Sequence, residues 1–221
     1  GGWAGQGGRG GVVNGGGVGS VTRGGANGAG VAGDTGAGSA GVDDGARRHR
    51  GQPFEQDGAL ARQGRVVPAG LEAMLAHPFF ARPAPKSLER LSFHAVLALL
   101  EGLGPEDGAA TLTALSAQAV ARTPLPEQPA AWFVCGGGRH NPALMHALAA
   151  GLSAPVRPVE ALGWKGDALE AECFGFLAVH SLRGLPLSLP TTTGVAAPQR
   201  GGRLTCGGIT PYARTALPFT P

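Results

Sequence analysis

At 221 residues, with 43% hydrophobic and 15% charged residues, the chain is long enough for one large domain or two small ones. Its net charge of +3 comes from scattered arginines, so composition implies no nucleic-acid partner. No stretch approaches the roughly 20 consecutive apolar residues of a membrane span, and glycines stand where a signal peptide would be apolar, so we expect a cytoplasmic protein with no membrane partner.

Glycine is the compositional anomaly. About half of the 40 glycines precede residue 51, and GGWAGQGGRGGVVNGGGVGS has too little side-chain surface to offset the entropy of ordering its backbone. Composition alone therefore predicts disorder there. The composition becomes that of an ordinary globular protein near residue 50. We divide the chain into a glycine-rich segment at 1–50, a domain at 51–203 and a disordered tail at 204–221.

The first globular stretch is expected to be mostly helical. Ala and Leu recur at helical spacing and predict short helices at 57–64 and 69–76. The prolines of HPFFARPAPKS predict an extended segment at 77–87, because each removes a backbone donor and biases its predecessor away from helix. A helix at 88–100 is expected next. Another begins at Pro105, where proline and the acids that follow suit a helix N-terminus.

The second half alternates strands and helices. The apolar run AAWFVC at 130–135 predicts a buried strand that empties into three glycines at 136–138. A helix follows at once, with Asn141 as its N-cap. A short strand at 155–160 and a long helix at 167–182 come next. This order predicts an α/β fold with parallel neighbouring strands.

Two glycine-rich segments are candidate ligand sites. In VCGGGRHNP at 134–142, a strand delivers glycines to a capped helix start, so backbone N–H groups could meet a nucleotide at close range. The alternative is a plain strand-to-helix turn that needs glycine only for its geometry. In GDTGAGS at 33–39, Asp34 stands on a small flexible loop and could act as a general base. The alternative is an ordinary solvated turn residue.

Three further polar residues are ambiguous from the sequence. Asp167 and Glu170 open the last long helix, where the helix dipole favours acids whatever the function, although Glu170 sits one turn further in. Lys86 could reach an anionic ligand, but we expect an exposed loop lysine.

At this point the sequence resembles a known family, the anhydro-N-acetylmuramic acid kinases. Five blocks are similar to segments of that family, in its order and at its intervals, over about residues 10–203: HPFFARPAPKSLER, LEGLGPEDGAATLTAL, VCGGGRHNPALMHAL, EALGWKGDALEAECFGFLA and LPTTTG. Five separate blocks are more specific than any single glycine motif.

The resemblance implies an α/β actin-like, sugar-kinase ATPase fold built from ribonuclease-H-like domains. It implies a cytoplasmic enzyme of peptidoglycan recycling that uses ATP and Mg²⁺. Such an enzyme opens the anhydro ring of 1,6-anhydro-N-acetylmuramic acid by hydrolysis and phosphorylates O6, which gives N-acetylmuramate 6-phosphate. The implied partners are therefore ATP and the anhydro-amino-sugar, and a homodimer is compatible with the family.

The resemblance also implies roles for individual residues. DTGAGS is similar to the family's DTGPGN, so Asp34 corresponds to the carboxylate that activates the attacking water. VVNGGGVGSVT is similar to the family's second phosphate loop, NLGGIANVT, so Gly16 and Gly17 would approach the ATP phosphates. The glycines at 136–138 would line the adenosine side, and Glu170 resembles a family acid near the sugar. The resemblance implies no side-chain metal ligand among these residues.

The match departs from the family in two ways. The N-terminal MSGTSxDG hairpin has no counterpart here, so the resemblance covers the C-terminal part of the family and implies an incomplete first domain. Small residues also replace larger ones, such as Gly15 where the family has Leu. Because such changes cost about 2–5 kcal/mol each in a core, we expect residues 1–45 to pack poorly.

Two other functions remain open. An inactive fragment or degenerate copy could serve as a nucleotide-binding or dimerisation module, which would bind nucleotide without forming the phosphorylated sugar. A disordered RNA-binding arm is the third hypothesis. It would need repeated arginines and interleaved aromatic residues, whereas the segment offers only Arg9, Arg23 and Trp3.

Overall fold

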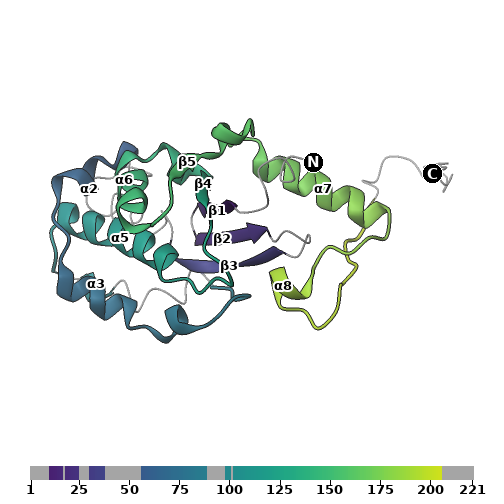
Figure 1. Ribbon diagram of the computed structural model, residues 1–221, viewed down its shortest axis with the longest axis horizontal. Helices are drawn as coiled ribbons and strands as arrows, with labels where there is room; N and C mark the ends of the chain where they lie inside the picture. The colour runs from purple at the N-terminus through teal and green to yellow at the C-terminus, as the bar shows by residue number, and fades with distance from the viewer. Residues whose placement is uncertain are drawn as a thin grey trace.

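The protein is described here by a computed structural model that covers residues 10–16, 18–24, 30–37, 56–88, 98–100 and 102–205. A five-stranded sheet in the order β3-β2-β1-β4-β5 lies at its centre (Figure 1). The strands are β1 (Gly10–Gly15), β2 (Val18–Gly24), β3 (Gly30–Ala37), β4 (Ala131–Cys135) and β5 (Val156–Pro158). β2 is antiparallel to both of its neighbours, whereas β1, β4 and β5 are parallel. The α/β class and the parallel neighbours predicted for β4 and β5 are confirmed.

Two helices cover one face of the sheet (Figure 1). They are α5 (Pro105–Ala121) and α6 (Pro142–Gly151). In the strands beneath them, Val13 pairs with Val21 on one side and with Val134 on the other, so the three side chains share this face. They form a buried cluster with residues of both helices, which include Val120 and Leu148. This cluster fixes β1 and β2 against the helical layer.

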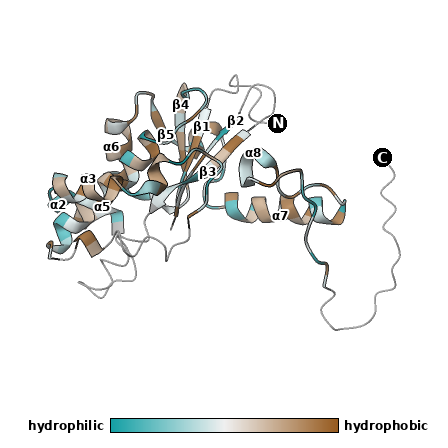
Figure 2. Ribbon diagram, turned by 90° about the horizontal axis from the view of Figure 1, so that it is seen from below, coloured by the Kyte–Doolittle hydropathy of each residue, from teal (hydrophilic) through white to brown (hydrophobic). Residues whose placement is uncertain are grey.

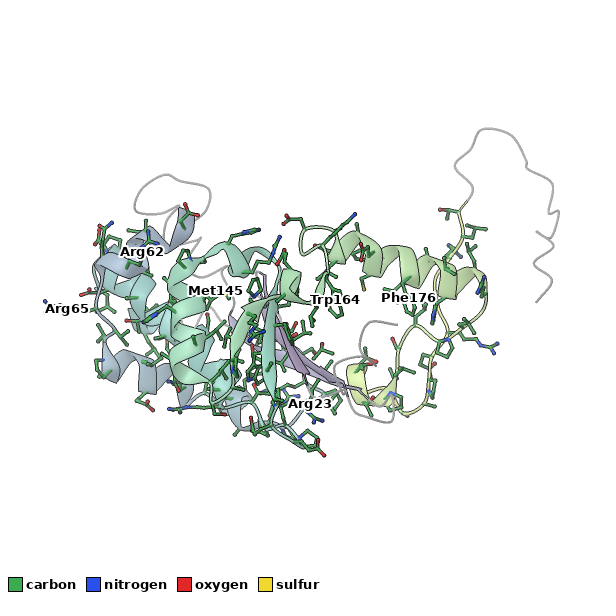
Figure 3. The ribbon with its side chains drawn as sticks, turned by 45° about the horizontal axis from the view of Figure 1, so that its top comes forward. Arg23, Arg62, Arg65, Met145, Trp164 and Phe176 are labelled. Carbon is green, nitrogen blue, oxygen red and sulfur yellow. The ribbon has the colours of Figure 1, made fainter. Side chains whose placement is uncertain are left out.

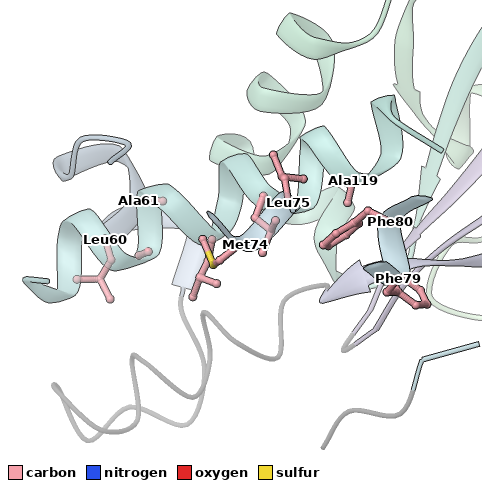
Figure 4. Packing of buried hydrophobic residues seen from close by; sticks show 10 residues of the cluster. Leu60, Ala61, Met74, Leu75, Phe79, Phe80 and Ala119 are labelled. Atoms are coloured by element: carbon pink, nitrogen blue, oxygen red, sulfur yellow. The ribbon is translucent and has the colours of Figure 1, made fainter. Parts of the chain in front are cut away.

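A second buried cluster surrounds the other side of α5 (Figure 4). The short elements α2 (Ala59–Gln63), α3 (Pro68–Leu75) and the 3-10 turn η3 (Pro78–Ala81) contribute most of it. Met74 and Leu115 are completely buried there. Phe79 and Phe80 meet edge to face, with ring centroids 5.7 Å apart. The cluster therefore packs α2, α3 and η3 against α5.

The last helices lie on the other side of the sheet (Figure 1). They are α7 (Leu169–Leu182) and α8 (Pro190–Thr193), and no residue of α7 is buried. Phe174 and Phe176 are 64% and 59% exposed. Figure 2 shows hydrophobic stretches along α7, and Figure 3 places Phe176 far from Met145 of α6, across the sheet. No helix in the described part of the chain combines the length and apolarity needed to cross a membrane.

Local sequence rules predicted several of these elements. Asn141 caps α6, because its Oδ1 accepts a hydrogen bond of 3.1 Å from the Leu144 N–H. The extended segment expected at 77–87 is wrong at its start, because η3 forms there: the His77 ring nitrogen Nδ1 accepts from the Phe79 N–H at 3.2 Å. Of the helix expected at 88–100, residues 89–97 lie outside the described part, and residues 98–100 form a 3-10 turn.

The expectation of poor packing in the glycine-rich segment is wrong for its three strands. Val13 and Val21 are only 3% and 1% exposed. Gly15 leaves no cavity, because a Cβ there would lie 2.9 Å from the Cα of Gly138. Backbone pairing with β4, far along the chain, satisfies the hydrogen bonds that local composition could not account for.

Candidate functional site

One row of paired residues crosses the sheet and joins Asp34 to the glycine turn after β4. Asp34 pairs with Ser20, Ser20 with Asn14, and Asn14 with Cys135, which precedes Gly136. Neighbouring strands are about 4.8 Å apart, so Asp34 and this turn lie roughly 14 Å apart. Both lie at the edge of the sheet where the carboxyl ends of β1 and β4 meet. The register puts Asp34 on the face opposite α5 and α6, where α7 and α8 lie.

The glycine corner, which we define as Gly136–Gly138, packs against the hairpin between β1 and β2. A Cβ on Gly136, whose φ is +71°, would lie 2.4 Å from Asn14 Oδ1. A Cβ on Gly138 would lie 2.7 Å from the Gly15 carbonyl oxygen, whereas a Cβ on Gly137 would have no neighbour within 4 Å. Tight geometry therefore accounts for the outer two glycines. At Gly137 the backbone is open to close approach by a ligand.

Asn14 joins the hairpin to the glycine corner and was not singled out by sequence reasoning. Its Oδ1 accepts a 3.0 Å hydrogen bond from the Gly16 N–H and lies beside Gly136. This places Gly16 next to the glycine corner. Gly17, the second expected phosphate-loop glycine, lies outside the described residues. The asparagine within VVNGGG was the only sequence signal available.

Asp34 is half-buried and held by backbone groups of residues 86–88. Its N–H donates to the Lys86 carbonyl at 2.8 Å, and its Oδ2 accepts a 2.7 Å hydrogen bond from the Leu88 N–H. A bulge follows, because Ser20 pairs with Asp34 while Gly19 pairs with Gly36. Asp34 therefore lies within strand β3 and not on the flexible loop expected from the sequence, and it is not a freely solvated turn residue.

Lys86 is buried, which corrects the expectation of an exposed loop lysine. It is 6% exposed, and its Nζ donates to the Phe79 carbonyl at 3.0 Å and lies 4.4 Å from the centre of the Phe79 ring. Burial lowers the pKa of Lys86, and the charge of Arg82 lowers it further, while Asp34 opposes both. No local sequence pattern indicates that Lys86 is buried, because the acceptors are backbone carbonyls.

Arg139 links the glycine corner to the segment before α7. Its Nη1 donates to the Gly136 carbonyl at 2.8 Å and its Nε to Glu160 Oε1 at 2.9 Å. Its Nη2 lies 2.5 Å from Asp167 Oδ1, and the guanidinium side chain is only 3% exposed. Asp167 thus has a structural partner beyond the helix dipole. This link also positions the first turn of α7, which carries Glu170.

Glu170 is exposed, three residues after Asp167. Within the described residues no hydrogen bond or ion pair joins it to Asp34. The structure thus brings Asp34, Gly16 and the glycine corner to one edge of the sheet. Glu170 lies three residues after Asp167, which is paired with Arg139 beside the glycine corner. Arg23, considered for an RNA-binding arm, is 8% exposed and paired with Glu127, so it belongs to the fold; Arg9 and Trp3 lie outside the described part.

We expect Arg139→Met to flatten the acid dependence of stability. The hydrogen bond from Arg139, followed by that from His140, lowers the pKa of Asp167 from its ordinary 3.8. The backbone N–H of Glu160 and then Arg139 lower the pKa of Glu160 from 4.5. The unfolded state then binds more protons, so this stabilisation is complete above about pH 5 and is lost as the pH falls through and below these values.

The measurement is the melting temperature between pH 6 and pH 3. The wild-type slope should be steeper than that of Arg139→Met. Arg122→Met, which removes an exposed ion pair with Glu72, serves as the control and should keep the wild-type slope. Identical slopes in wild type and Arg139→Met would show that the buried guanidinium does not hold the two acids ionised.

The backbone at this edge of the sheet leaves space for a ligand. Gly137 offers an unobstructed backbone, and the adjacent hairpin supplies Gly16. Among the residues that the structure describes, no group of three or more His, Cys, Asp or Glu side chains could hold a metal ion. Mg²⁺ bound with ATP takes most of its ligands from phosphate oxygens and water, so such an ion would need few side-chain ligands.

Comparisons with known proteins identify one family. The family described as anhydro-N-acetylmuramic acid kinase matches residues 5–207. A protein of that name from Acidiphilium cryptum (strain JF-5) is 60% identical over 164 residues, which are 74% of this chain and 46% of the relative. Namesakes from Rhodospirillum rubrum and Gluconobacter oxydans (strain 621H) are each 55% identical over 163 residues, which are 73% of this chain and 43% and 45% of those relatives.

The chain therefore spans somewhat less than half the length of these relatives. Its mixed five-stranded sheet with helices is that of a sugar-kinase, actin-like ATPase fold. On the matched residues and on these identities, the chain belongs to the anhydro-N-acetylmuramic acid kinase family.

Proposed function

We propose that the protein acts as an ATP-dependent sugar kinase that converts 1,6-anhydro-N-acetylmuramic acid into N-acetylmuramate 6-phosphate, in the cytoplasm and as part of peptidoglycan recycling. The observation that carries the proposal is the row of paired residues across the sheet. Asp34, whose carboxylate is hydrogen-bonded, lies in this row at the same edge of the sheet as Gly16 and the glycine corner. The names of the relatives supply the substrate.

In the proposed reaction, Asp34 takes a proton from the water that attacks the anomeric carbon. The bond from that carbon to O6 breaks. O6 then accepts the γ-phosphoryl group of ATP, and ADP is the leaving group. Phosphoryl transfer is mostly a matter of positioning and electrostatics, and Mg²⁺ would supply charge neutralisation at the phosphates. Gly16, Gly17 and the glycine corner would hold the nucleotide, and Glu170 would contact the sugar.

The glycine-rich segment at 1–50 and the domain at 51–203 would work as one catalytic unit. Pairing of β1 with β4 supports this, because the sheet of the site is built from both parts. Most of the tail at 204–221 lies outside the described residues. A homodimer remains a prediction.

A second candidate function is a nucleotide-binding or dimerisation module without catalysis. The observation that favours it is the open backbone at Gly137, which can accommodate a ligand whether or not a reaction follows. Formation of ADP and N-acetylmuramate 6-phosphate separates the two candidates, because the module would bind nucleotide and yield no product.

The first test is nucleotide binding. With ATP and Mg²⁺ at about 100 times the Kd, ligand that binds only the folded state adds about 2.7 kcal/mol of stability, which raises the melting temperature of a chain of this size by roughly 5–10 °C. Gly137→Val should keep the wild-type melting temperature without ligand and lose the shift, because its side chain would enter the open space at the glycine corner.

The control variant is Gly151→Val, which also has no neighbour within 4 Å of a Cβ and lies at the far end of α6. It should keep the full shift. A wild-type chain whose melting temperature does not respond to saturating ATP and Mg²⁺ would contradict the proposed nucleotide site.

A further inference from the structure

The outer edge of β3 is covered by residues 84–88, which we call the clamp segment. Its Lys86 carbonyl accepts from the Asp34 N–H at 2.8 Å, and its Leu88 N–H donates to Asp34 Oδ2 at 2.7 Å. A Cβ on Gly33 would lie 3.2 Å from both the Ala84 Cβ and the Lys86 N, so the segment approaches β3 as closely as glycine permits. Asp34 is thus fixed through both its backbone and its carboxylate.

The side chain of Lys86 ties the clamp segment to the interior. Its Nζ donates to the Phe79 carbonyl at 3.0 Å and lies 3.5 Å from that of Phe80, over the Phe79 ring. Phe79 and Phe80 belong to η3 and to the buried cluster around α5. A connection therefore runs from this cluster through Lys86 to the hydrogen bond on Asp34.

Burial of an ammonium group is unfavourable, and an apolar side chain would fill the same space without that cost. Burial and Arg82 both lower the pKa of Lys86, while the charge of Asp34 raises it, so Lys86 and Asp34 attract each other. The charged groups that face Lys86 are Arg82 at the end of η3 and Asp34 on β3. Lys86 therefore puts an ammonium group beside Asp34, the candidate base, although burial of that group costs free energy.

We propose that Lys86 is a positioning residue for Asp34: it holds the clamp segment so that the Leu88 N–H occupies Oδ2 and leaves Oδ1 to face the attacking water. Among the described residues the hydrogen bond to the Asp34 carboxylate is made at Oδ2, and none is made at Oδ1. The catalytic meaning of this arrangement rests on the proposed function. The arrangement itself can be tested without nucleotide or sugar.

The experiment uses the whole 221-residue chain, labelled with ¹⁵N and ¹³C, and follows the Leu88 amide by NMR. Asp34→Ala, which has no side-chain acceptor, defines the Leu88 amide shift when this hydrogen bond is absent. Lys86→Met should move the Leu88 amide towards that shift and speed its hydrogen exchange at least tenfold, with the Val134 and Leu148 amides unchanged. Lys165→Met, at the other lysine of the chain, should change none of these.

A folded Lys86→Met chain with an unaltered Leu88 amide would overturn the proposal. If that variant does not fold, the unaltered chain decides the question. Raising the pH should then move the Asp34 carboxyl carbon in one step centred below the ordinary lysine pKa of 10.5, as Lys86 loses its proton. A carboxyl carbon that stays fixed through that range would also overturn the proposal. If these NMR results are as expected but the chain does not bind nucleotide, the positioning of Asp34 by Lys86 would stand and the proposed kinase function would fail.

Discussion

Trp132→Ala is expected to lower the free energy of unfolding by about 3–5 kcal/mol, because truncation of a large buried aromatic side chain loses its burial and leaves a cavity. Trp132 is 2% exposed in the middle of the sheet. A Cβ on Gly11 of β1 would lie 2.7 Å from its indole ring, so the strand packs directly on it. Domains of this kind have roughly 5–15 kcal/mol in total, so the variant should be marginally folded.

Urea unfolding followed by far-UV circular dichroism measures this effect without relying on tryptophan fluorescence. Phe174→Ala is the matched control, since this aromatic side chain is 64% exposed on α7, and its change should stay within about 0.5 kcal/mol. Because β4 delivers the glycine corner, Trp132→Ala should also abolish the thermal shift with ATP and Mg²⁺. Equal urea midpoints for wild type and Trp132→Ala would contradict the packing of β4 described here.

The elements that the sequence predicted well are those with local signals. Pro105 at a helix start, Asn141 as a cap and the glycines after the apolar run at 130–135 each act within a few residues, and α5, β4 and α6 formed where these signals placed them. Such signals depend on backbone geometry that neighbouring residues impose, so a single sequence suffices to find them.

The strands β1 to β3 were not predictable in this way. Their glycines have low strand propensity, and their stability comes from partners far along the chain, such as Val134 beside Val13 and the Trp132 ring over Gly11. Only the resemblance to a family phosphate loop pointed to order there. Where glycine stands in these strands, another chain segment often comes close, which composition cannot show.

The candidate site was predicted in outline and its supports were missed. The sequence named Asp34 and the glycine corner, and the sheet brings both to one edge. It did not reveal Lys86 or Arg139 as buried residues, because their partners are backbone carbonyls or acids more than 20 residues away, as in the bond between Arg139 and Glu160. Long charged side chains are usually exposed, so burial of either one is a property of the tertiary structure.

Asp34→Asn is expected to lower kcat for formation of N-acetylmuramate 6-phosphate by about 10²–10⁴-fold, the usual contribution of a general base. The amide oxygen of asparagine can still accept from the Leu88 N–H, so the clamp geometry and the fold should survive. It cannot take the proton of the attacking water. The reaction is followed with saturating ATP, Mg²⁺ and 1,6-anhydro-N-acetylmuramic acid, and the variant is compared with the unaltered chain under the same conditions.

The control for Asp34→Asn is Asp57→Asn, at an exposed position with φ +57°, where asparagine is well tolerated. It should leave kcat unchanged. Both variants should keep the melting temperature and its shift with ATP and Mg²⁺, which separates loss of the base from loss of binding. If Asp34→Asn formed product at the wild-type rate, another group would have to activate the water, and the edge of β3 would be only a structural support for the nucleotide site.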